Sequence, residues 1–301
     1  MAPSSHINHF FITIITLIIT FSFFTPIHTV DPIAVFHGVS DGCKYMNTSQ
    51  LVANLSRDLN TTVECIEIGN GFMTSWFRNI TTQCEQACEA INNNPSFVGN
   101  FSILGISQGT LISRYIIQKC NLINRRVVRY LSFEGPQQGV AGIPNLNCGS
   151  FCDFINNSAG KHAMKDVVYR NIAPTNYLKP RYHYDEYLEK NQFLKYLNNE
   201  IPNKDEEIRN RFKALEKLML IKGNRDTVIN PKDSWWFEYY GKDGKEIVKL
   251  EDSEFYKEDF IGLKEMMDKG KVEFVEFSGK HVLYTQEEYD KYLLRFFKDE
   301  S

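Results

Sequence analysis

A serine between two glycines, in Gly105-Ile106-Ser107-Gln108-Gly109, is the side chain of this sequence best placed to act as a nucleophile in acyl transfer. The pattern glycine-x-serine-x-glycine arises often by chance, so its surroundings decide its weight. The apolar stretch Phe101–Ile106 predicts a strand before the serine, and Gln108–Lys119 has the composition of a helix after it. A sharp turn from strand to helix would lift the Ser107 oxygen above a sheet, and the glycines would leave room for it. The alternative is a serine that only shapes a turn or caps a helix.

A serine hydroxyl is inert at neutral pH unless a base takes its proton. In enzymes built on such a strand-to-helix turn, the acid and the base follow in the order serine, acid, histidine. His281 fits the base, because it follows the apolar stretch Val272–Phe277 and precedes the last helical segment, Gln286–Phe297. The other six histidines precede the serine or lie in segments without this pattern: His6, His9, His28, His37, His162 and His183.

The acid should lie on a loop that follows a strand between the serine and the histidine. Asp226 meets this condition, because it comes shortly after the apolar stretch Leu218–Ile221. Its carboxylate would fix the imidazole tautomer and stabilise the imidazolium formed during attack. An aspartate here could instead cap the turn that leads to Pro231. Asp233 is the second candidate for the acid, although it is better placed to cap the segment Ser234–Tyr239.

Acyl transfer also needs backbone N–H donors for the negative oxygen of the tetrahedral intermediate. The residue after the nucleophile, Gln108, is expected to supply the first. The loop His37-Gly38-Val39, which follows the apolar stretch Ile33–Phe36, is expected to supply the second through Val39 N–H. The side chain of His37 is interpreted as holding this loop rather than taking part in the reaction.

The elements that must position these residues alternate along the chain. Strands are predicted at Ile33–Phe36, Val63–Ile68, Phe101–Ile106, Val127–Phe133, Leu218–Lys222 and Val272–Phe277. Helices are predicted at Thr48–Leu59, Ser75–Asn92, Gln108–Lys119 and Gln286–Phe297. This alternation predicts an α/β protein with a mostly parallel sheet and helices on both faces. With the order serine, acid, histidine, it favours the α/β-hydrolase fold.

One segment, at about residues 140–211, breaks the alternation. It is rich in asparagine, tyrosine, lysine and proline and has a short helical pattern at Tyr184–Leu197. Loops of this length without structure are uncommon in compact domains. We therefore expect an inserted helical cap over the carboxyl edge of the sheet, within a single domain of residues 30–301.

The bulk composition excludes other classes of function. With 301 residues and a formal net charge of -3, the chain has no broad basic field that would attract nucleic acid. Cys84 and Cys88 would lie on one helix with no histidine near them in sequence, so a zinc site is not expected. No motif indicates another metal or an organic cofactor.

Residues 1–29 are predicted to be a signal peptide. Phe10–Phe24 is uncharged and mostly apolar and ends at Thr25-Pro26, and it is shorter than the roughly 20 residues of a spanning helix. Because no lysine or arginine precedes it, an uncleaved anchor is the alternative. No comparable stretch follows, so no membrane span is expected in the mature protein, which we expect in the secretory pathway, in the lysosome or vacuole, or secreted.

Glycosylation motifs and cysteines agree with export. Six Asn-x-Ser/Thr sequons occur, at Asn47, Asn54, Asn60, Asn79, Asn100 and Asn156. The chain has seven cysteines, and an exported protein keeps its thiols oxidised. Three disulfides and one remaining thiol are therefore expected, with the pairing left open by the residues alone.

Several longer stretches carry a resemblance to a known family. They are Phe36-His37-Gly38-Val39-Ser40-Asp41, Glu67-Ile68-Gly69-Asn70-Gly71, Ile106-Ser107-Gln108-Gly109, Cys152-Asp153-Phe154, Leu197-Asn198-Asn199-Glu200-Ile201-Pro202-Asn203 and Gly279-Lys280-His281. On these, the chain resembles the palmitoyl-protein thioesterases of the lysosomal type, particularly the plant sequences. The likeness runs from about Pro32 to Phe297.

The resemblance implies roles for individual residues. It places the nucleophile, acid and base on Ser107, Asp226 and His281, and the oxyanion donors on Val39 and Gln108. It implies the disulfides Cys43–Cys65, Cys88–Cys120 and Cys148–Cys152, with Cys84 left unpaired. It also implies that the segment after Val140 forms the wall of a groove for an acyl chain.

The chain departs from the family after the fourth predicted strand. It has Glu134-Gly135-Pro136-Gln137 where the family usually has Gly-Gly-Pro-His. A carboxylate and an amide at the catalytic edge of the sheet are expected to alter either the substrate preference or the pKa of His281. The three catalytic positions themselves are intact.

The expected function is hydrolysis of long-chain acyl, typically palmitoyl, thioesters through an acyl-serine intermediate. The implied substrates are S-palmitoylated proteins or peptides, with acyl-CoA as a further thioester. Two alternatives stay open at this point. One is a lipase or acyl-ester hydrolase that uses the same triad, and the other is a catalytically silent binding protein with a hydrolase fold.

Overall fold

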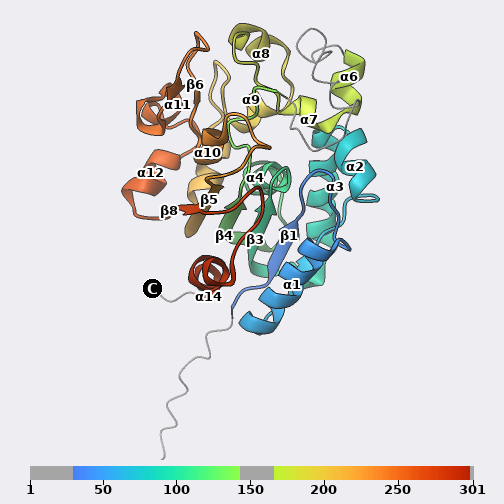
Figure 1. The fold of residues 1–301 in the computed structure, drawn as a ribbon. Coiled ribbons are helices and arrows are strands. Elements are labelled where there is room, and N and C mark those ends of the chain that lie inside the picture. Colours follow the sequence, from blue (N-terminus) through green and yellow to red (C-terminus); the bar gives the residue numbers. More distant parts are fainter. Residues whose placement is uncertain (1–29, 143–165, 299–301) are drawn as a thin grey trace, which may run out of the picture.

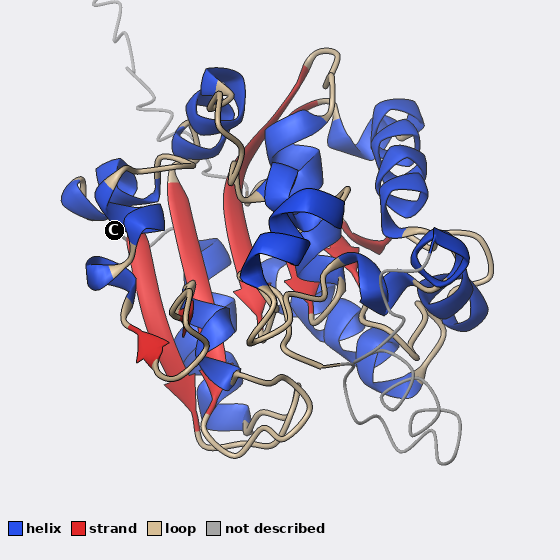
Figure 2. Cartoon of the chain, turned by 90° about the horizontal axis from the view of Figure 1, so that it is seen from above, coloured by secondary structure: helices blue, strands red, loops and turns tan. Residues whose placement is uncertain are grey.

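A computed structural model describes residues 30–142 and 166–298. Six strands form one sheet in the order β2-β1-β3-β4-β5-β8, and every neighbouring pair is parallel (Figures 1 and 2). The strands are β1 (Ile33–Phe36), β2 (Val63–Cys65), β3 (Gly99–Ile106), β4 (Arg125–Phe133), β5 (Lys217–Gly223) and β8 (Val272–Phe277). The predicted α/β class with a parallel sheet is confirmed.

The central strands are buried along nearly their whole length because helices cover both faces of a parallel sheet. All four residues of β1 are buried, as are the last six of β3 and the last seven of β4. These continuous apolar runs are what made the strands visible in the sequence. β1 and β8 have the predicted limits, whereas β2 ends at Cys65 rather than at Ile68.

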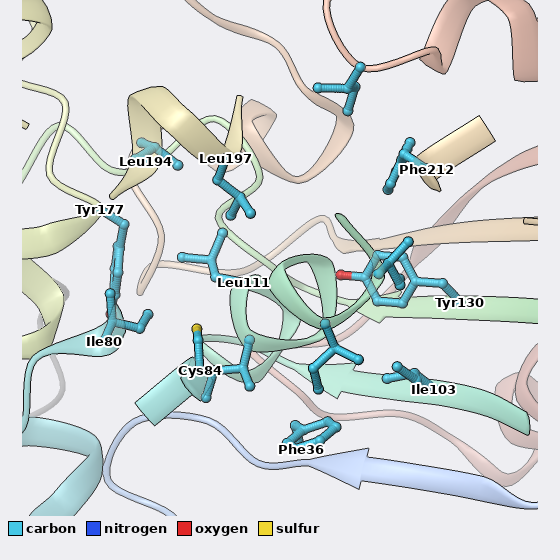
Figure 3. Packing of buried hydrophobic residues seen from close by; sticks show 14 of the residues in the cluster. Phe36, Ile80, Cys84, Ile103, Leu111, Tyr130, Tyr177, Leu194, Leu197 and Phe212 are labelled. Carbon is cyan, nitrogen blue, oxygen red and sulfur yellow. The ribbon is translucent and has the colours of Figure 1, made fainter. Parts of the chain in front are cut away.

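Two hydrophobic clusters lie on the two faces of the sheet. On one face, α1 (Met46–Leu59) packs with the C-terminal helical segment through residues such as Leu55 and Phe297. On the other face, α3 (Ile80–Asn93) and α4 (Gly109–Lys119) pack through residues such as Cys84 and Leu111 (Figure 3). The helix after the serine is therefore fixed against the sheet by its own apolar side.

Two predicted helices are interrupted in the structure. The predicted helix Ser75–Asn92 is divided into α2 (Phe72–Phe77) and α3, because the Asn79 side chain caps α3 by accepting from Thr81 N–H at 2.9 Å. The last predicted helix consists of α13 (Gln286–Glu288), a π-helical turn η4 (Tyr289–Leu294) and α14 (Arg295–Lys298).

Short helices connect β4 to β5 where the insertion is expected. They are α6 (Asp166–Asn171), α7 (Ala173–Asn176), α8 (Tyr184–Lys190), α9 (Leu194–Leu197) and α10 (Glu206–Lys213). The predicted pattern Tyr184–Leu197 is divided at Asn191, because its Oδ1 accepts from the amides of Phe193 and Lys195 and starts a new helix. Figure 1 shows α6 to α9 above α4, at the opposite end of the molecule from α14.

The remaining elements complete the C-terminal half and one connection before β3. They are η1 (Pro95–Phe97), η2 (Lys232–Trp236), β6 (Tyr239–Tyr240), β7 (Ile247–Val248), η3 (Leu250–Asp252), α11 (Glu254–Lys257) and α12 (Leu263–Asp268). Within the described ranges, no helix has both the length and the apolar character needed to cross a bilayer. The predicted signal peptide lies outside the described residues.

Two of the three disulfides implied by the resemblance are present. Cys43 is bonded to Cys65 and ties a loop to β2, and Cys88 is bonded to Cys120 and joins α3 to the end of α4. Cys84 is buried with a free thiol, as expected. Cys148 and Cys152 lie outside the described residues, so their bridge stays a prediction.

Candidate active site

Ser107 lies at the sharp turn between β3 and α4, with its backbone in the left-handed region at φ 50°. A non-glycine residue rarely adopts this conformation, and at a nucleophile it exposes the side chain above the sheet. The flanking glycines allow it: a Cβ at Gly105 would lie 2.6 Å from Ser113 Oγ, and one at Gly109 would collide with the Phe36 carbonyl. The expected strand-turn-helix is confirmed.

The structure brings Ser107, His281 and Asp226 together from three separate loops. His281 Nε2 lies 3.0 Å from Ser107 Oγ, and His281 Nδ1 lies 2.5 Å from Asp226 Oδ2. For Nε2 to accept the serine proton, Nδ1 must carry the other proton and donate it to the carboxylate. This is the connected arrangement of nucleophile, base and orienting acid that acyl transfer requires.

Asp226 also does what the alternative interpretation assigned to it. Its Oδ1 accepts from Val228 N–H at 2.5 Å and so fixes the turn after β5, while its Oδ2 faces His281. The two roles are compatible because they use different oxygens. Asp233 lies within the 3₁₀ turn η2, which begins at Lys232, so the expectation that it caps Ser234–Tyr239 is wrong.

A second carboxylate reaches the same imidazole nitrogen. Glu134 Oε2 lies 3.1 Å from His281 Nδ1, and the Glu134 side chain is fully buried. Burial lowers the pKa of His281, but the hydrogen bonds and charges of Asp226 and Glu134 outweigh it and raise this pKa to about 9. Burial raises the pKa of Glu134, while the imidazole and the Val282 amide oppose this shift.

The oxyanion donors expected from the sequence lie beside the serine. Val39 and Ser107 line the same cavity, and Gln108 is the first residue after the nucleophile. No acceptor within the described residues binds the amide of Val39 or that of Gln108. A Cβ at Gly38 would lie 3.0 Å from Ser107 Cβ, which shows how closely the first loop approaches the nucleophile.

The side chain of Gln108 fixes its own backbone N–H, the first expected donor, in place. It is buried, donates through Nε2 to Ser75 O at 2.9 Å, and accepts at Oε1 from Tyr177 OH at 3.0 Å. Tyr177 belongs to the inserted segment, so the insertion contacts the nucleophile turn directly. Ser75 and Tyr177 were not predicted as site residues, because neither carries a chemical signature of its own.

His37 has the structural role expected of it. Its Nε2 lies 2.8 Å from Glu67 Oε1, and the other Glu67 oxygen accepts from Cys43 N–H at 2.8 Å. Glu67 thus joins both ends of the loop that carries Val39. Its partnership with His37 was not predicted, although Glu67 stood within one of the stretches shared with the family.

A cavity of about 330 Å³ opens on Ser107 and His281. Its other walls come from the loop after β1, from α1 and from the loop after β8, with Val39, Leu51 and Leu283 among its apolar residues. Among the described residues of the insertion, none lines this cavity. Residues 143–165 lie outside the described residues, so the expectation that the segment after Val140 forms the wall of an acyl-chain groove stays a prediction.

The insertion instead lines a larger cavity of about 450 Å³ that does not include the triad. Lys179 and Glu200 form a buried ion pair there, with 2.6 Å between Nζ and Oε1. Tyrosine rings surround the ammonium group, including those of Tyr187 and Tyr239. The catalytic geometry, and not cavity size, therefore identifies the cavity at Ser107 as the candidate active site.

Glu134 and Gln137, the two residues that depart from the family pattern, point to different parts of the molecule. Glu134 contacts the base, as described above. Gln137 turns into the core, where its Nε2 donates to Ser132 Oγ at 2.7 Å and its Oε1 accepts from Arg114. The expectation of an amide at the catalytic edge is therefore wrong for Gln137, while the carboxylate of Glu134 is where it was expected.

One group of potential metal ligands occurs in the described part of the chain. Ligand atoms of Glu134, Asp226 and His281 lie within 4.8 Å of one another. A cation bound between them would displace the Nδ1 proton that holds the imidazole in its basic tautomer. We therefore interpret the cluster as a hydrogen-bonded group and not as a metal site.

Comparison with known proteins agrees with this geometry. The sequence model of the family described as "Palmitoyl protein thioesterase" matches residues 32–281. The chain belongs to this family. The matched range includes the strands, the nucleophile turn, the inserted segment and all three residues of the triad. The resemblance inferred from the sequence is thereby confirmed.

Individual relatives cover most of the chain. It is similar to palmitoyl-protein thioesterase 3 of Dictyostelium discoideum, with 30% identity covering 86% of this chain and 88% of the relative. Palmitoyl-protein thioesterase 1 of Caenorhabditis elegans shares 28% identity, covering 83% and 86%. A lysosomal thioesterase PPT2 homolog of Drosophila melanogaster shares 25%, covering 80% and 82%.

Among solved structures, the chain is similar to a monoacylglycerol lipase of Paleococcus ferrophilus, with a TM-score of 0.49 and 11% identity. That alignment covers 90% of this chain and 95% of the lipase. It is also similar to the esterase Pf2001 of Pyrococcus furiosus, with a TM-score of 0.46 and 14% identity, covering 90% and 83%.

Proposed function

We propose that the protein hydrolyses long-chain acyl thioesters of cysteine residues in proteins or peptides, with Ser107 as the nucleophile. The observation that carries this proposal is the hydrogen-bonded series from Ser107 Oγ through His281 to Asp226, in a chain that belongs to a thioesterase family. Acyl-CoA is proposed as a further substrate, because it contains the same thioester bond.

In the first half of the reaction, His281 Nε2 takes the proton of Ser107 Oγ as this oxygen attacks the thioester carbon. The carbonyl oxygen becomes negative and is stabilised by the N–H groups of Val39 and Gln108. Collapse of the intermediate breaks the carbon–sulfur bond and releases the cysteine sulfur. The imidazolium gives its proton to the departing sulfur, so the product is a thiol and His281 is neutral again. Because a thiol has a pKa of about 8.5, far below that of an alcohol, this protonation is less demanding than for an alcohol leaving group.

In the second half, water attacks the acyl-Ser107 ester. His281 takes a proton from this water and returns it to Ser107 Oγ, which releases the fatty acid. Asp226 holds the imidazole in the same tautomer in both halves. The acyl chain is proposed to occupy the 330 Å³ cavity beside α1, where each buried CH₂ contributes about 0.8 kcal/mol.

Comparing turnover of a palmitoyl-cysteinyl peptide with that of the matched palmitoyl-serine ester tests this substrate class. We expect faster hydrolysis of the thioester, because its leaving group is the better one. Ser107→Ala is the control and should abolish both reactions. A clear preference for the oxygen ester or for triglyceride would instead favour the lipase alternative. A folded protein whose Ser107 does not react with a fluorophosphonate would overturn both enzyme functions.

The proposed location is the secretory pathway, leading to the lysosome or vacuole or to secretion. The relative from Drosophila is described as lysosomal, and residues 1–29 have the composition of a signal peptide.

Asn47, Asn60 and Asn100 are exposed and are the best placed glycan acceptors. Asn79 is less suited, because its Nδ2 donates to Tyr169 O at 3.4 Å. Deglycosylation followed by peptide mapping tests these sites.

A further inference from the structure

Glu134 is a buried carboxylate in direct contact with the catalytic base, and the three-residue mechanism makes no use of it. It follows β4, its side chain is fully buried, and its Oε2 lies 3.1 Å from His281 Nδ1. Asp226 Oδ2 lies 2.5 Å from the same nitrogen. One N–H group therefore faces two carboxylate oxygens that belong to different loops.

The fold holds Glu134 in this position at some cost. Its backbone is in the left-handed region at φ 51°, which is unfavourable for a non-glycine residue. Val282 N–H donates to Oε2 at 2.5 Å and fixes the carboxylate beside the histidine loop. Gly223 leaves the space for Oε1, because a Cβ there would collide with that oxygen.

The second oxygen of Glu134 supports an electrostatic role. Oε1 is buried and has no hydrogen-bond partner within the described residues. Leaving a charged group without full hydrogen bonding in the interior is unfavourable unless a nearby opposite charge compensates. The imidazolium that His281 becomes during attack is the positive group in contact with this carboxylate.

We propose that Glu134 is a second acid for His281, which shares the Nδ1 proton with Asp226, stabilises the imidazolium, and orients the imidazole when Asp226 is removed. It acts as a positioning residue, because it contacts the base and not the substrate. This proposal rests on the proposed function of Ser107 and His281 as nucleophile and base.

The other charged groups around His281 bind other partners, so they do not stabilise its imidazolium. Arg225 and Glu288 bind the backbone of Ser278, at its carbonyl and its amide. Asp41, across the cavity, accepts from Thr48 Oγ1 at 2.6 Å. Tyr284 and Lys280 belong to the histidine loop itself, and the ring nitrogens of His281 bind Asp226 and Ser107 instead. Among the described residues, Glu134 and Asp226 are the two carboxylates that contact His281.

The sign of the pH effect follows from the charge. His281 acts as a base only when it is neutral, so kcat/KM rises with pH through the pKa of the free enzyme's imidazole. A second carboxylate stabilises the protonated form and moves this limb to higher pH, in line with the raised pKa of His281. Removing the charge of Glu134 should therefore move the limb to lower pH.

The test uses Glu134→Gln, Glu134→Gly, Asp226→Ala and the double variant Asp226→Ala/Glu134→Gln. Glutamine keeps an oxygen for Val282 N–H but loses the charge, and glycine is the residue usual in the family. Glu238→Gln is the matched control, because it neutralises a largely buried carboxylate that is paired with Lys249 instead of His281. The readouts are kcat/KM against pH for a soluble acyl thioester and the rate of fluorophosphonate labelling.

We expect both Glu134 variants to shift the acid limb down by about one pH unit, and Glu238→Gln to leave it unchanged. Asp226→Ala should lose about 10- to 100-fold in kcat, because Glu134 still orients the base. The double variant should lose about 10⁴-fold in kcat, as an enzyme does when its only triad acid is lost. If Asp226→Ala were as inactive as the double variant, or if the limb of both Glu134 variants coincided with that of the parent, Glu134 would be only a structural residue.

A second measurement separates this proposal from the proposed function. The pKa of His281 can be followed by NMR in the parent protein and in Glu134→Gly, whether or not any substrate is turned over. A lower pKa in the variant supports the second acid even if the thioesterase function fails. An unchanged pKa overturns the second acid even if palmitoyl thioesters are hydrolysed.

Discussion

Arg114, on the helix that follows the nucleophile, offers a strong test of how the inserted segment is held to the sheet. Its guanidinium is fully buried and binds four acceptors. Nη1 donates to the Gln137 carbonyl at 2.8 Å and to its side chain at 3.2 Å, and Nη2 donates to Leu197 O at 2.9 Å and to Asn198 Oδ1 at 3.1 Å. The group also lies 5.0 Å from the centre of the Phe237 ring. One side chain thus joins α4, the loop after β4 and the end of α9.

The variant Arg114→Met removes the donors and keeps a similar volume. Each bond to a charged group contributes about 1.5–3 kcal/mol, so the four bonds set an upper limit. Two effects offset part of this loss. The methionine side chain is also buried and apolar, and the variant no longer has to bury a charge. The cost of burying that charge is visible in the parent protein, where burial lowers the pKa of Arg114 to about 10. We expect a net loss of about 3–5 kcal/mol, because acceptors that stay buried lose their donor.

Urea unfolding followed by tryptophan fluorescence measures this loss, and calorimetry should show a fall in Tm of roughly 10 °C. Arg126→Met is the matched control, because its side chain is 53% exposed and binds Glu216 and the Ala214 carbonyl at the surface. The control should lose less than about 1 kcal/mol. An Arg114→Met protein within 1 kcal/mol of the parent, with an unchanged denaturant slope, would refute the reasoning.

Two further predictions concern the nucleophile turn and the cysteines. Gly38→Ala would place a Cβ 3.0 Å from Ser107 Cβ and push the oxyanion loop outward. We therefore expect kcat to fall about 10- to 100-fold with little change in KM. Activity equal to that of the parent in a steady-state assay would contradict the assigned oxyanion site. Cys84 is buried and burial raises its pKa, so iodoacetamide should leave it unlabelled in the native protein. After unfolding without reductant, one labelled thiol is expected if Cys148 and Cys152 are bonded, and three would exclude that bridge.

The strands and the triad could be predicted because their signals are local. Ile33–Phe36 is a continuous apolar run buried along its whole length, and Val272–Phe277 has apolar residues at four of its six positions, so both strands had correct limits. The serine, acid and histidine each follow such a strand, and parallel strands bring their carboxyl ends to the same edge of the sheet. Residues far apart in sequence thus meet for a reason that the sequence itself contains.

The points at which the helices are interrupted, and the residues that line the cavity at Ser107, could not be predicted in the same way. Asn79 and Asn191 start new helices through hydrogen bonds of one side chain each, which a periodic pattern does not show. The cavity at Ser107 opens toward α1 because of how side chains pack around it, and not because of any motif. For this reason the sequence did not indicate which residues line it.

The role of Glu134 could be predicted only in part. Its position was noticed because it departs from the family pattern, and an effect on the pKa of His281 was one of the two consequences expected. The geometry that makes the contact specific depends on Gly223, at the end of β5, and on the Val282 amide, in the loop after β8. Their combination with a left-handed residue after β4 became evident only in three dimensions.

The most direct test of the central claim is to trap the acyl-enzyme. The protein would be mixed with a palmitoyl-cysteinyl peptide, quenched with acid within the first turnover, digested and mapped by mass spectrometry. The account predicts a palmitoyl group on the fragment that contains Ser107, and neither adduct nor thiol release in Ser107→Ala. Thiol release by Ser107→Ala at the parent rate, or an adduct on another residue, would contradict it.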